Sequence, residues 1–191
     1  MTLEEIKKMN KADLSGKIIC FSTDTVVGLG CMIDDNIALE KIYNLKHRDN
    51  KKPLAILVPN SDCVKEFVDD VPFKAQEMME KYWPGALTII FKKKTNEYDL
   101  LTRGLSTIGL RMPNSKIALT VLNQFGPMAT TSVNISGNPP INDIDEIKEL
   151  FKDKIDYYVT EKEEHIGVSS TVVDLTNNQC KILRQGSIII D

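Results

Sequence analysis

The residues most able to do chemistry in this sequence lie between positions 46 and 54 (KHRDNKKPL). Four cations fall within seven of these residues, although the formal net charge of the whole 191-residue chain is −3. Cations spaced so closely repel one another unless solvent or an anion screens them. We therefore predict that Lys46, Arg48 and Lys52 bind phosphate. The alternative is a solvated loop that is merely rich in lysine.

Short hydrogen-bonding side chains follow two apolar runs. The sequence Ser-Thr-Asp-Thr at 22–25 comes directly after one run, and Ser132 and Asn134 end another. If the second segment stays extended, Ser132 and Asn134 face the same side and can hold one ligand. In both places the alternative is a turn whose side chains cap their own backbone.

Arginines and hydroxyls recur nearer the C-terminus. The guanidinium of Arg111 follows an apolar run and could bind a carboxylate through two hydrogen bonds, or pair with an internal acid instead. Residues 169–171 (SST) and 184–186 (RQG) repeat the pattern. The G-x-G at 28–30 lacks the third glycine of a dinucleotide fingerprint, and no P-loop motif occurs. Any nucleotide must therefore be held in another way.

Apolar periodicity places these side chains on a series of elements. Strands are predicted at residues 17–22, 54–58, 86–91, 107–112, 128–133, 157–160, 171–175 and 181–183. Helices are predicted at residues 3–14, 36–45, 62–82 with a break near Pro72, 115–125 and 143–151. The polar segments 92–102 and 161–168 are predicted loops.

The alternation of strands and helices indicates an α/β fold with a twisted, mixed parallel and antiparallel open sheet flanked by helices. We expect the short strands after residue 155 to add to the sheet edge in antiparallel fashion. Residues 1–191 are enough for one sizeable core and require no second one, so we predict a single domain.

The composition bears on compartment and on metal binding. Cys20, Cys31, Cys63 and Cys180 are widely spaced, with no C-x-x-C pair and only two histidines to complete a metal site. We predict reduced, mostly buried thiols and no metal held by the protein. The N-terminus lacks the apolar core of a signal peptide, and no segment approaches membrane-spanning length. We expect a soluble, cytoplasmic protein without membrane contact.

Seven fragments, in this order, resemble motifs of the YrdC/TsaC family of threonylcarbamoyl-AMP synthases in its short, single-domain form. They are Thr23-Asp24-Thr25-Val26-Val27-Gly28-Leu29, Lys46-x-Arg48 with Lys52-Pro53-Leu54, Trp83-Pro84-Gly85-x-x-Thr88, Arg111-x-Pro113, Ser132-x-Asn134-x-Ser136-Gly137, Ser170-Thr171-Val172-Val173-Asp174 and Leu183-Arg184-x-Gly186. Val27 departs from the family by replacing an aromatic residue, which costs a packing surface near the ligand. Leu57 stands where some relatives carry a histidine at the threonine pocket.

The resemblance implies a YrdC-like fold with a concave basic cleft, and an ATP-dependent nucleotidyltransferase. L-threonine and bicarbonate or CO2 would form a carbamate that attacks the α-phosphorus of ATP, giving threonylcarbamoyl-AMP and pyrophosphate. Catalytic charge neutralisation would come from Lys46, Arg48 and Lys52, with Mg²⁺ held mainly by the ATP phosphates. By the same resemblance, threonine would contact Thr25, Arg111 and Ser170, and ATP would contact Arg48, Lys52, Thr107, Ser132, Asn134 and Arg184.

The family's product serves the threonylcarbamoyladenosine modification of tRNA, so the resemblance also implies a transient partner, the transferase complex of the TsaD system. Two alternatives stay open. One is a non-enzymatic module that binds double-stranded RNA, against which the negative net charge speaks. The other is a carbamoyl-transfer domain of the hydrogenase-maturation type, whose acylphosphatase-like region and zinc fingers this sequence lacks.

Overall fold

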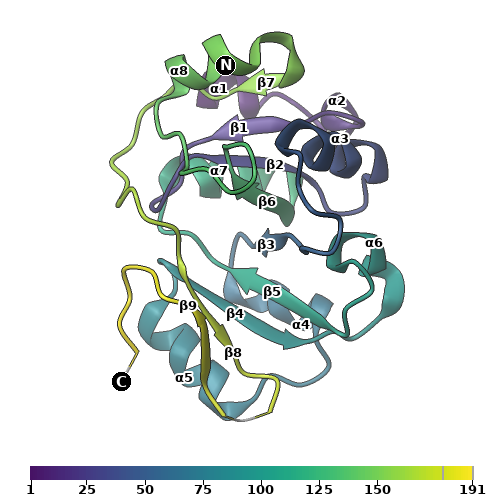
Figure 1. The fold of residues 1–191 in the computed structure, drawn as a ribbon, viewed down its shortest axis with the longest axis vertical. Helices are drawn as coiled ribbons and strands as arrows, with labels where there is room; N and C mark the ends of the chain where they lie inside the picture. The colour runs from purple at the N-terminus through teal and green to yellow at the C-terminus, as the bar shows by residue number, and fades with distance from the viewer. Residues whose placement is uncertain (178, 191) are drawn as a thin grey trace.

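The computed structural model describes residues 1–177 and 179–190. Within these residues the strands form one nine-stranded sheet with the order β7-β1-β2-β6-β3-β5-β4-β8-β9 (Figure 1). The strands are β1 (Ile19–Phe21), β2 (Gly28–Met32), β3 (Ala55–Leu57), β4 (Leu87–Lys92), β5 (Thr107–Arg111), β6 (Met128–Ser132), β7 (Tyr157–Tyr158), β8 (Thr171–Asp174) and β9 (Lys181–Arg184). The predicted mixed sheet is confirmed.

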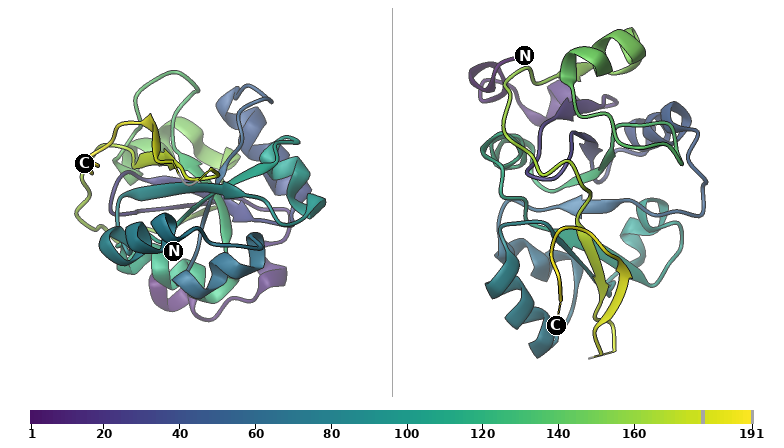
Figure 2. Two further views of the ribbon diagram at one scale, coloured as in Figure 1. Left: turned by 90° about the horizontal axis from the view of Figure 1, so that it is seen from below. Right: turned by 60° about the vertical axis from the view of Figure 1, so that its left-hand side comes forward.

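Helices lie on both sides of this sheet (Figure 2). They are α1 (Leu3–Ile6), α2 (Lys11–Leu14), α3 (Asn36–Lys46), α4 (Val64–Phe67), α5 (Phe73–Tyr82), α6 (Asp99–Thr102), α7 (Lys116–Phe125) and α8 (Ile144–Phe151), with 3-10 turns η1 (Ser61–Cys63), η2 (Asn96–Tyr98) and η3 (Lys152–Lys154). Helices α1, α2 and α7 share a buried cluster with Ile19 and Phe21 of β1, whereas α3 and α8 share another with Cys20. Because alternate strand residues point to opposite faces, the two clusters lie on opposite faces of the sheet at β1.

The expected antiparallel pairing after residue 155 is wrong for two strands. Strand β7 pairs in parallel with β1, and β8 pairs in parallel with β4. Only β9 adds in antiparallel fashion, to β8. Parallel neighbours require a long connection. Residues 22–156 separate β1 from β7 and residues 93–170 separate β4 from β8, whereas β8 and β9 follow each other closely.

Three other segments differ from the prediction. Residues 3–14 form two short helices, because the Asn10 side chain accepts a hydrogen bond from the Ala12 amide over 2.9 Å and starts α2 anew. The predicted loop at 92–102 contains η2 and α6. Strand β2 was not predicted, because its two glycines obscure the strand pattern; a side chain at Gly30 would lie 3.1 Å from the Phe21 ring.

The remaining predictions on composition are met in part. Cys20 and Cys31 are buried, and burial raises the pKa of Cys31 to about 12, but Cys63 is half-buried and Cys180 is exposed. The expectation of mostly buried thiols is therefore wrong for Cys180, which lies just before the exposed edge strand β9. Among the described residues, no helix has the length and apolar character needed to cross a membrane.

Candidate active site

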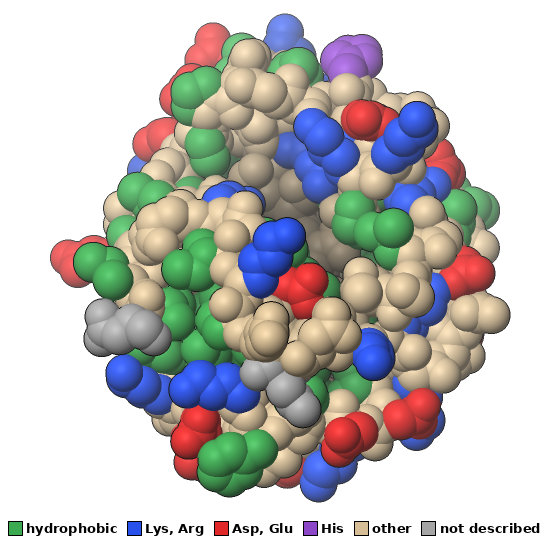
Figure 3. All heavy atoms as spheres, turned by 60° about the horizontal axis from the view of Figure 1, so that its bottom comes forward, with side chains coloured by type: hydrophobic (Ala, Val, Ile, Leu, Met, Phe, Trp, Pro, Cys, Tyr) green, Lys and Arg blue, Asp and Glu red, His purple; other side chains and the backbone are tan. Residues whose placement is uncertain are grey.

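A cavity of about 320 Å³ opens where the polar ends of several strands converge. Its walls come from the turn before β2, the segment before β3, the middle of β4, the ends of β5 and β6, the start of β8 and the end of β9. One face of the molecule is hollowed, and several lysine and arginine side chains lie around the hollow, with acidic and hydrophobic side chains between some of them (Figure 3). The residues that line the cavity are Thr23, Thr25, Val26, Gly28, Arg48, Pro53, Leu54, Ala55, Leu57, Thr88, Ile90, Gly109, Arg111, Thr130, Thr131, Ser132, Ser169, Ser170, Val172 and Arg184.

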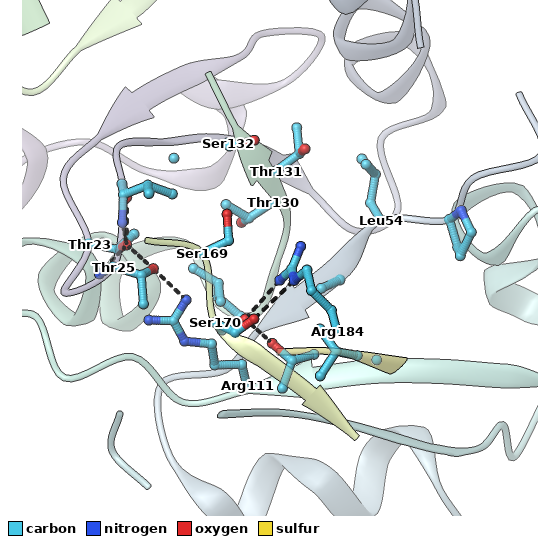
Figure 4. A pocket seen from close by; sticks show the side chains of 18 of the residues that line it. Thr23, Thr25, Leu54, Arg111, Thr130, Thr131, Ser132, Ser169, Ser170 and Arg184 are labelled. Atoms are coloured by element: carbon cyan, nitrogen blue, oxygen red, sulfur yellow. Dashed lines mark hydrogen bonds between the residues drawn. The ribbon is translucent and has the colours of Figure 1, made fainter. Parts of the chain in front are cut away.

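Arg111 stands at one side of this cavity and is held by three groups, of which Figure 4 draws Thr25. Its Nε donates to the Gly85 carbonyl over 2.9 Å, Nη1 donates to the Thr25 hydroxyl over 2.8 Å, and Nη2 forms an ion pair with Asp24. Burial lowers the pKa of Arg111, while Asp24 raises it. The guanidinium retains N–H groups for a ligand, because a planar fork carries more donors than these acceptors use.

Ser170 and Arg184 form the neighbouring wall. The Ser170 and Thr88 hydroxyls lie 2.8 Å apart. Arg184 donates from Nε to the Ser170 carbonyl over 3.0 Å and from Nη2 to the Ser170 hydroxyl over 3.1 Å (Figure 4). The backbone at Gly186 approaches residues 169–171 so closely that no side chain would fit there. The hairpin of β8 and β9 therefore places an arginine directly on a cavity serine.

Lys46 is buried beneath the turn that follows β6. Its Nζ donates to the Ser132 carbonyl over 2.5 Å, to the Asn134 carbonyl over 3.0 Å and to the Asn134 Oδ1 atom over 2.7 Å. Burial, with a smaller contribution from Arg48, lowers the pKa of Lys46 to about 7. These three acceptors match the donors of an ammonium group. Lys46 therefore supports the end of β6 at Ser132 and the turn that follows it, and it is not among the residues that line the cavity.

The structure brings together six of the ten predicted site residues. Those on the cavity wall are Thr25, Arg48, Arg111, Ser132, Ser170 and Arg184. Lys46 and Asn134 lie behind the wall, and Lys52 is exposed outside it. Thr107 lies at the opposite end of β5 from Arg111, about 13 Å along the strand.

The described part of the cavity wall carries three arginines and no acidic side chain. These cations act on one another: Arg48 lowers the pKa of Arg184, and Arg184 contributes to lowering that of Arg111, after the larger effect of burial in each case. Asp24 pairs with Arg111, but three guanidinium groups on one cavity wall still leave an excess of positive charge there, which favours an anionic ligand. The Arg48 guanidinium is also held in place by the protein, because it donates to the backbone carbonyls of Lys52 and Pro53.

Several cavity residues were missed in the sequence. Thr23 and Thr88 line the cavity and lie within the family fragments, but no substrate contact was predicted for them. None was predicted for Asp24 either, which lies outside the cavity wall and orients Arg111. Thr130 and Thr131 carry no local signal, because a threonine within a strand is common and it is the pairing of β6 with β2 and β3 that brings this end of β6 to the cavity. Of the two departures, Leu57 lines the cavity, whereas Val27 is buried in the core and does not.

The fold and the site together define an α/β protein whose mixed sheet carries a cavity lined by arginine side chains and hydroxyl groups. A family model described as "Telomere recombination" (Sua5, YciO and YrdC) matches residues 12–186, and the chain belongs to this family. The threonylcarbamoyl-AMP synthase of Pyrococcus abyssi is 34% identical over 92% of this chain and 52% of its own length. This chain thus spans about half the length of that relative.

Solved structures resemble the fold closely. P. abyssi Sua5 complexed with L-threonine has a TM-score of 0.89 and 33% identity, covering 97% of this chain and 55% of its own. Escherichia coli YciO has a TM-score of 0.84 and 26% identity, covering 97% of this chain and 91% of its own. The resemblance to the YrdC/TsaC family found in the sequence motifs is confirmed.

Proposed function

We propose that this protein is an L-threonylcarbamoyladenylate synthase that condenses L-threonine, bicarbonate or CO2, and ATP. One observation carries the proposal: Arg48, Arg111 and Arg184 line one cavity together with hydroxyl groups, and no acidic side chain of the described residues lines it. A site of this kind suits a substrate with a carboxylate at one end and phosphates at the other. Relatives named threonylcarbamoyl-AMP synthase, and a relative's structure with L-threonine, support the choice of substrates.

The proposed reaction forms two bonds. The threonine amine adds to CO2 and loses a proton, giving a carbamate. A carbamate oxygen then attacks the α-phosphorus of ATP, the bond from that phosphorus to the bridging oxygen breaks, and pyrophosphate leaves. Such a transfer needs positioning and charge neutralisation more than covalent help from the protein. Guanidinium groups in a partly enclosed cavity supply both.

The walls suggest where each substrate part binds. Arg111 and the hydroxyls of Thr25 and Ser170 would hold threonine, with the free N–H groups of Arg111 on its carboxylate. Arg48 and Arg184 would hold the phosphates, and Ser132 would contact the nucleotide. We assign supporting roles to Lys46 and Asn134, and we assign no contact to Thr107.

Mg²⁺ would arrive on the ATP phosphates. Among the described residues there is no cluster of three or more histidine, cysteine or acidic side chains that could hold a metal ion. Asp24, the acidic residue that contacts Arg111, is already paired with it. The product would pass to the TsaD-type transferase complex for tRNA modification, in the cytoplasm.

Pyrophosphate release tests the proposal. The pure protein is incubated with ATP, Mg²⁺ and bicarbonate, with and without L-threonine. We expect release that requires threonine and that falls about tenfold or more in Arg48→Ala, which corresponds to about 1.4 kcal/mol of transition-state stabilisation. Pyrophosphate release that is absent, or that is equal with and without threonine, would contradict the assignment.

A further inference from the structure

The carbonyl oxygen of Lys52 accepts hydrogen bonds from two side chains. Tyr43 donates from its hydroxyl group over 2.6 Å, and Arg48 donates from Nε over 3.2 Å. Arg48 also donates from Nη2 to the carbonyl of Pro53 over 2.9 Å. The position of these two carbonyls therefore decides where the Arg48 guanidinium lies in the cavity wall.

The path of the chain explains how Tyr43 reaches this point. Helix α3 ends at Lys46, and its capping residue His47 has a left-handed conformation with φ of 48°. The Arg48 amide turns back to donate to the Tyr43 carbonyl over 3.0 Å. The Lys52 amide then donates to the Asp49 carbonyl over 3.0 Å, which closes a turn. The loop thus leaves α3 and returns to it, and the Tyr43 hydroxyl joins its end to the helix.

Tyr43 is itself rigidly held and lies outside the cavity. It is 2% exposed and is absent from the cavity wall. The guanidinium carbon of Arg103 lies 3.6 Å from the centre of the Tyr43 ring, and Arg103 donates to Glu40 over 3.0 Å. A ring stacked in this way has little freedom to turn. Its hydroxyl group therefore has a fixed position, and its hydrogen bond to the Lys52 carbonyl fixes the end of the loop.

We infer that Tyr43 is a positioning residue that holds Arg48 against the phosphates of the substrate, an inference that rests on the proposed function. Tyr43 acts through the Lys52 carbonyl and touches no substrate. Without its hydroxyl group, that carbonyl would keep Arg48 as its only side-chain donor among the described residues. The loop and the guanidinium would then move together, and the loss would fall on phosphate binding and leave threonine binding intact.

Tyr43→Phe tests this inference, with Tyr158→Phe as the matched control. The Tyr158 hydroxyl likewise donates to a lysine carbonyl, that of Lys152, over 2.8 Å, but it lies on the edge strand β7. In Tyr43→Phe we expect the KM for ATP to rise about three- to tenfold, the range that loss of one hydrogen bond supports, with the KM for threonine changed less than about twofold. In Tyr158→Phe both KM values should stay as in the wild type. An unchanged KM for ATP in Tyr43→Phe, or equal rises for both substrates, would overturn the inference.

A double mutant separates positioning from general destabilisation. In the Arg48→Ala background, Tyr43→Phe should raise the KM for ATP no further, because the residue it positions is gone. A rise equal to that seen with Arg48 present would contradict the inference. Should the wild type release no threonine-dependent pyrophosphate, the proposed function fails by itself. The inference is then judged by the melting shift with inorganic tripolyphosphate, which Tyr43→Phe should reduce and Tyr158→Phe should not; equal shifts would overturn it.

Discussion

Arg111 donates to a carbonyl, a hydroxyl and a carboxylate at once, those of Gly85, Thr25 and Asp24. A lysine ammonium on a flexible stem cannot reproduce this planar arrangement. The orientation of Arg111 therefore depends on its guanidinium shape as much as on its charge.

We expect Arg111→Lys to raise the KM for threonine about tenfold or more while the KM for ATP changes little, since the fork that would face the substrate carboxylate is lost. Steady-state kinetics in both substrates measures this. Arg103→Lys, which replaces an arginine outside the cavity wall, should leave the KM for threonine unchanged. Equal losses for both substrates in Arg111→Lys would identify a structural arginine.

The Asn134 side chain holds the turn after β6 together through several hydrogen bonds. It is 8% exposed, its Oδ1 atom accepts from Lys46 over 2.7 Å and from Ser132 over 2.7 Å, and its Nδ2 atom donates to the Asn138 carbonyl over 2.7 Å. Asn134→Ala should lower the free energy of unfolding by about 1–3 kcal/mol, because it leaves buried partners unsatisfied. Urea unfolding measures this, with the exposed Asn123→Ala as control. A change below about 0.5 kcal/mol would contradict the role.

At the scale of elements, the β8 and β9 hairpin delivers Arg184 to Ser170 by a close approach at Gly186. The Gly186 amide donates to the Thr171 hydroxyl over 3.0 Å, and a side chain at this position would meet the backbone of residues 169–171. Backbone atoms cannot move aside as the end of a flexible side chain can. Any side chain at this position would therefore have to displace the backbone of the hairpin.

Gly186→Ala should cost about 2–3 kcal/mol of unfolding free energy and raise the KM for ATP through displacement of Arg184. Gly104→Ala is a useful comparison: Gly104 has φ of 76° but open space around it, so its cost should stay near 1 kcal/mol, without an effect on KM. Thermal unfolding and kinetics measure the two effects. Equal losses of unfolding free energy in the two variants would contradict the prediction, because they would show that the backbone accommodates a side chain at Gly186.

For the whole molecule, the cavity joins strands from the two halves of the sheet order, with β2 and β6 on one side and β4, β8 and β9 on the other. A ligand in it should stabilise residues 1–191 as one cooperative unit, as expected of a single domain. ATP with Mg²⁺ and threonine, at about a hundred times the dissociation constant, should add about 2.7 kcal/mol to the unfolding free energy. Thermal unfolding, followed by both circular dichroism and intrinsic fluorescence, measures the added stability, and coincident transitions would show one cooperative unit. Stabilisation by duplex RNA at low salt, with none by ATP, would favour the RNA-binding alternative instead.

The sequence by itself determined the class of fold, most of the strands and the chemical groups of the site. Apolar periodicity is a local property, and the cationic segment and the strand-end hydroxyls are visible as residue types. The order of the motifs was enough to indicate the family, which the match over residues 12–186 confirms.

Only the tertiary structure decided which of these groups meet. A local sequence pattern does not show which strands pair, so the parallel pairing of β7 with β1 and of β8 with β4 was missed. The pairing of β8 with β4 is what brings Ser170 beside Thr88. Burial also depends on the whole chain: Lys46 and Arg48 are two positions apart, yet one is buried beneath a turn and the other lines the cavity. Charge alone could not separate them, because both are cations of one short segment. Only the folded chain shows that the Lys46 ammonium group meets three protein acceptors while the Arg48 guanidinium faces the cavity.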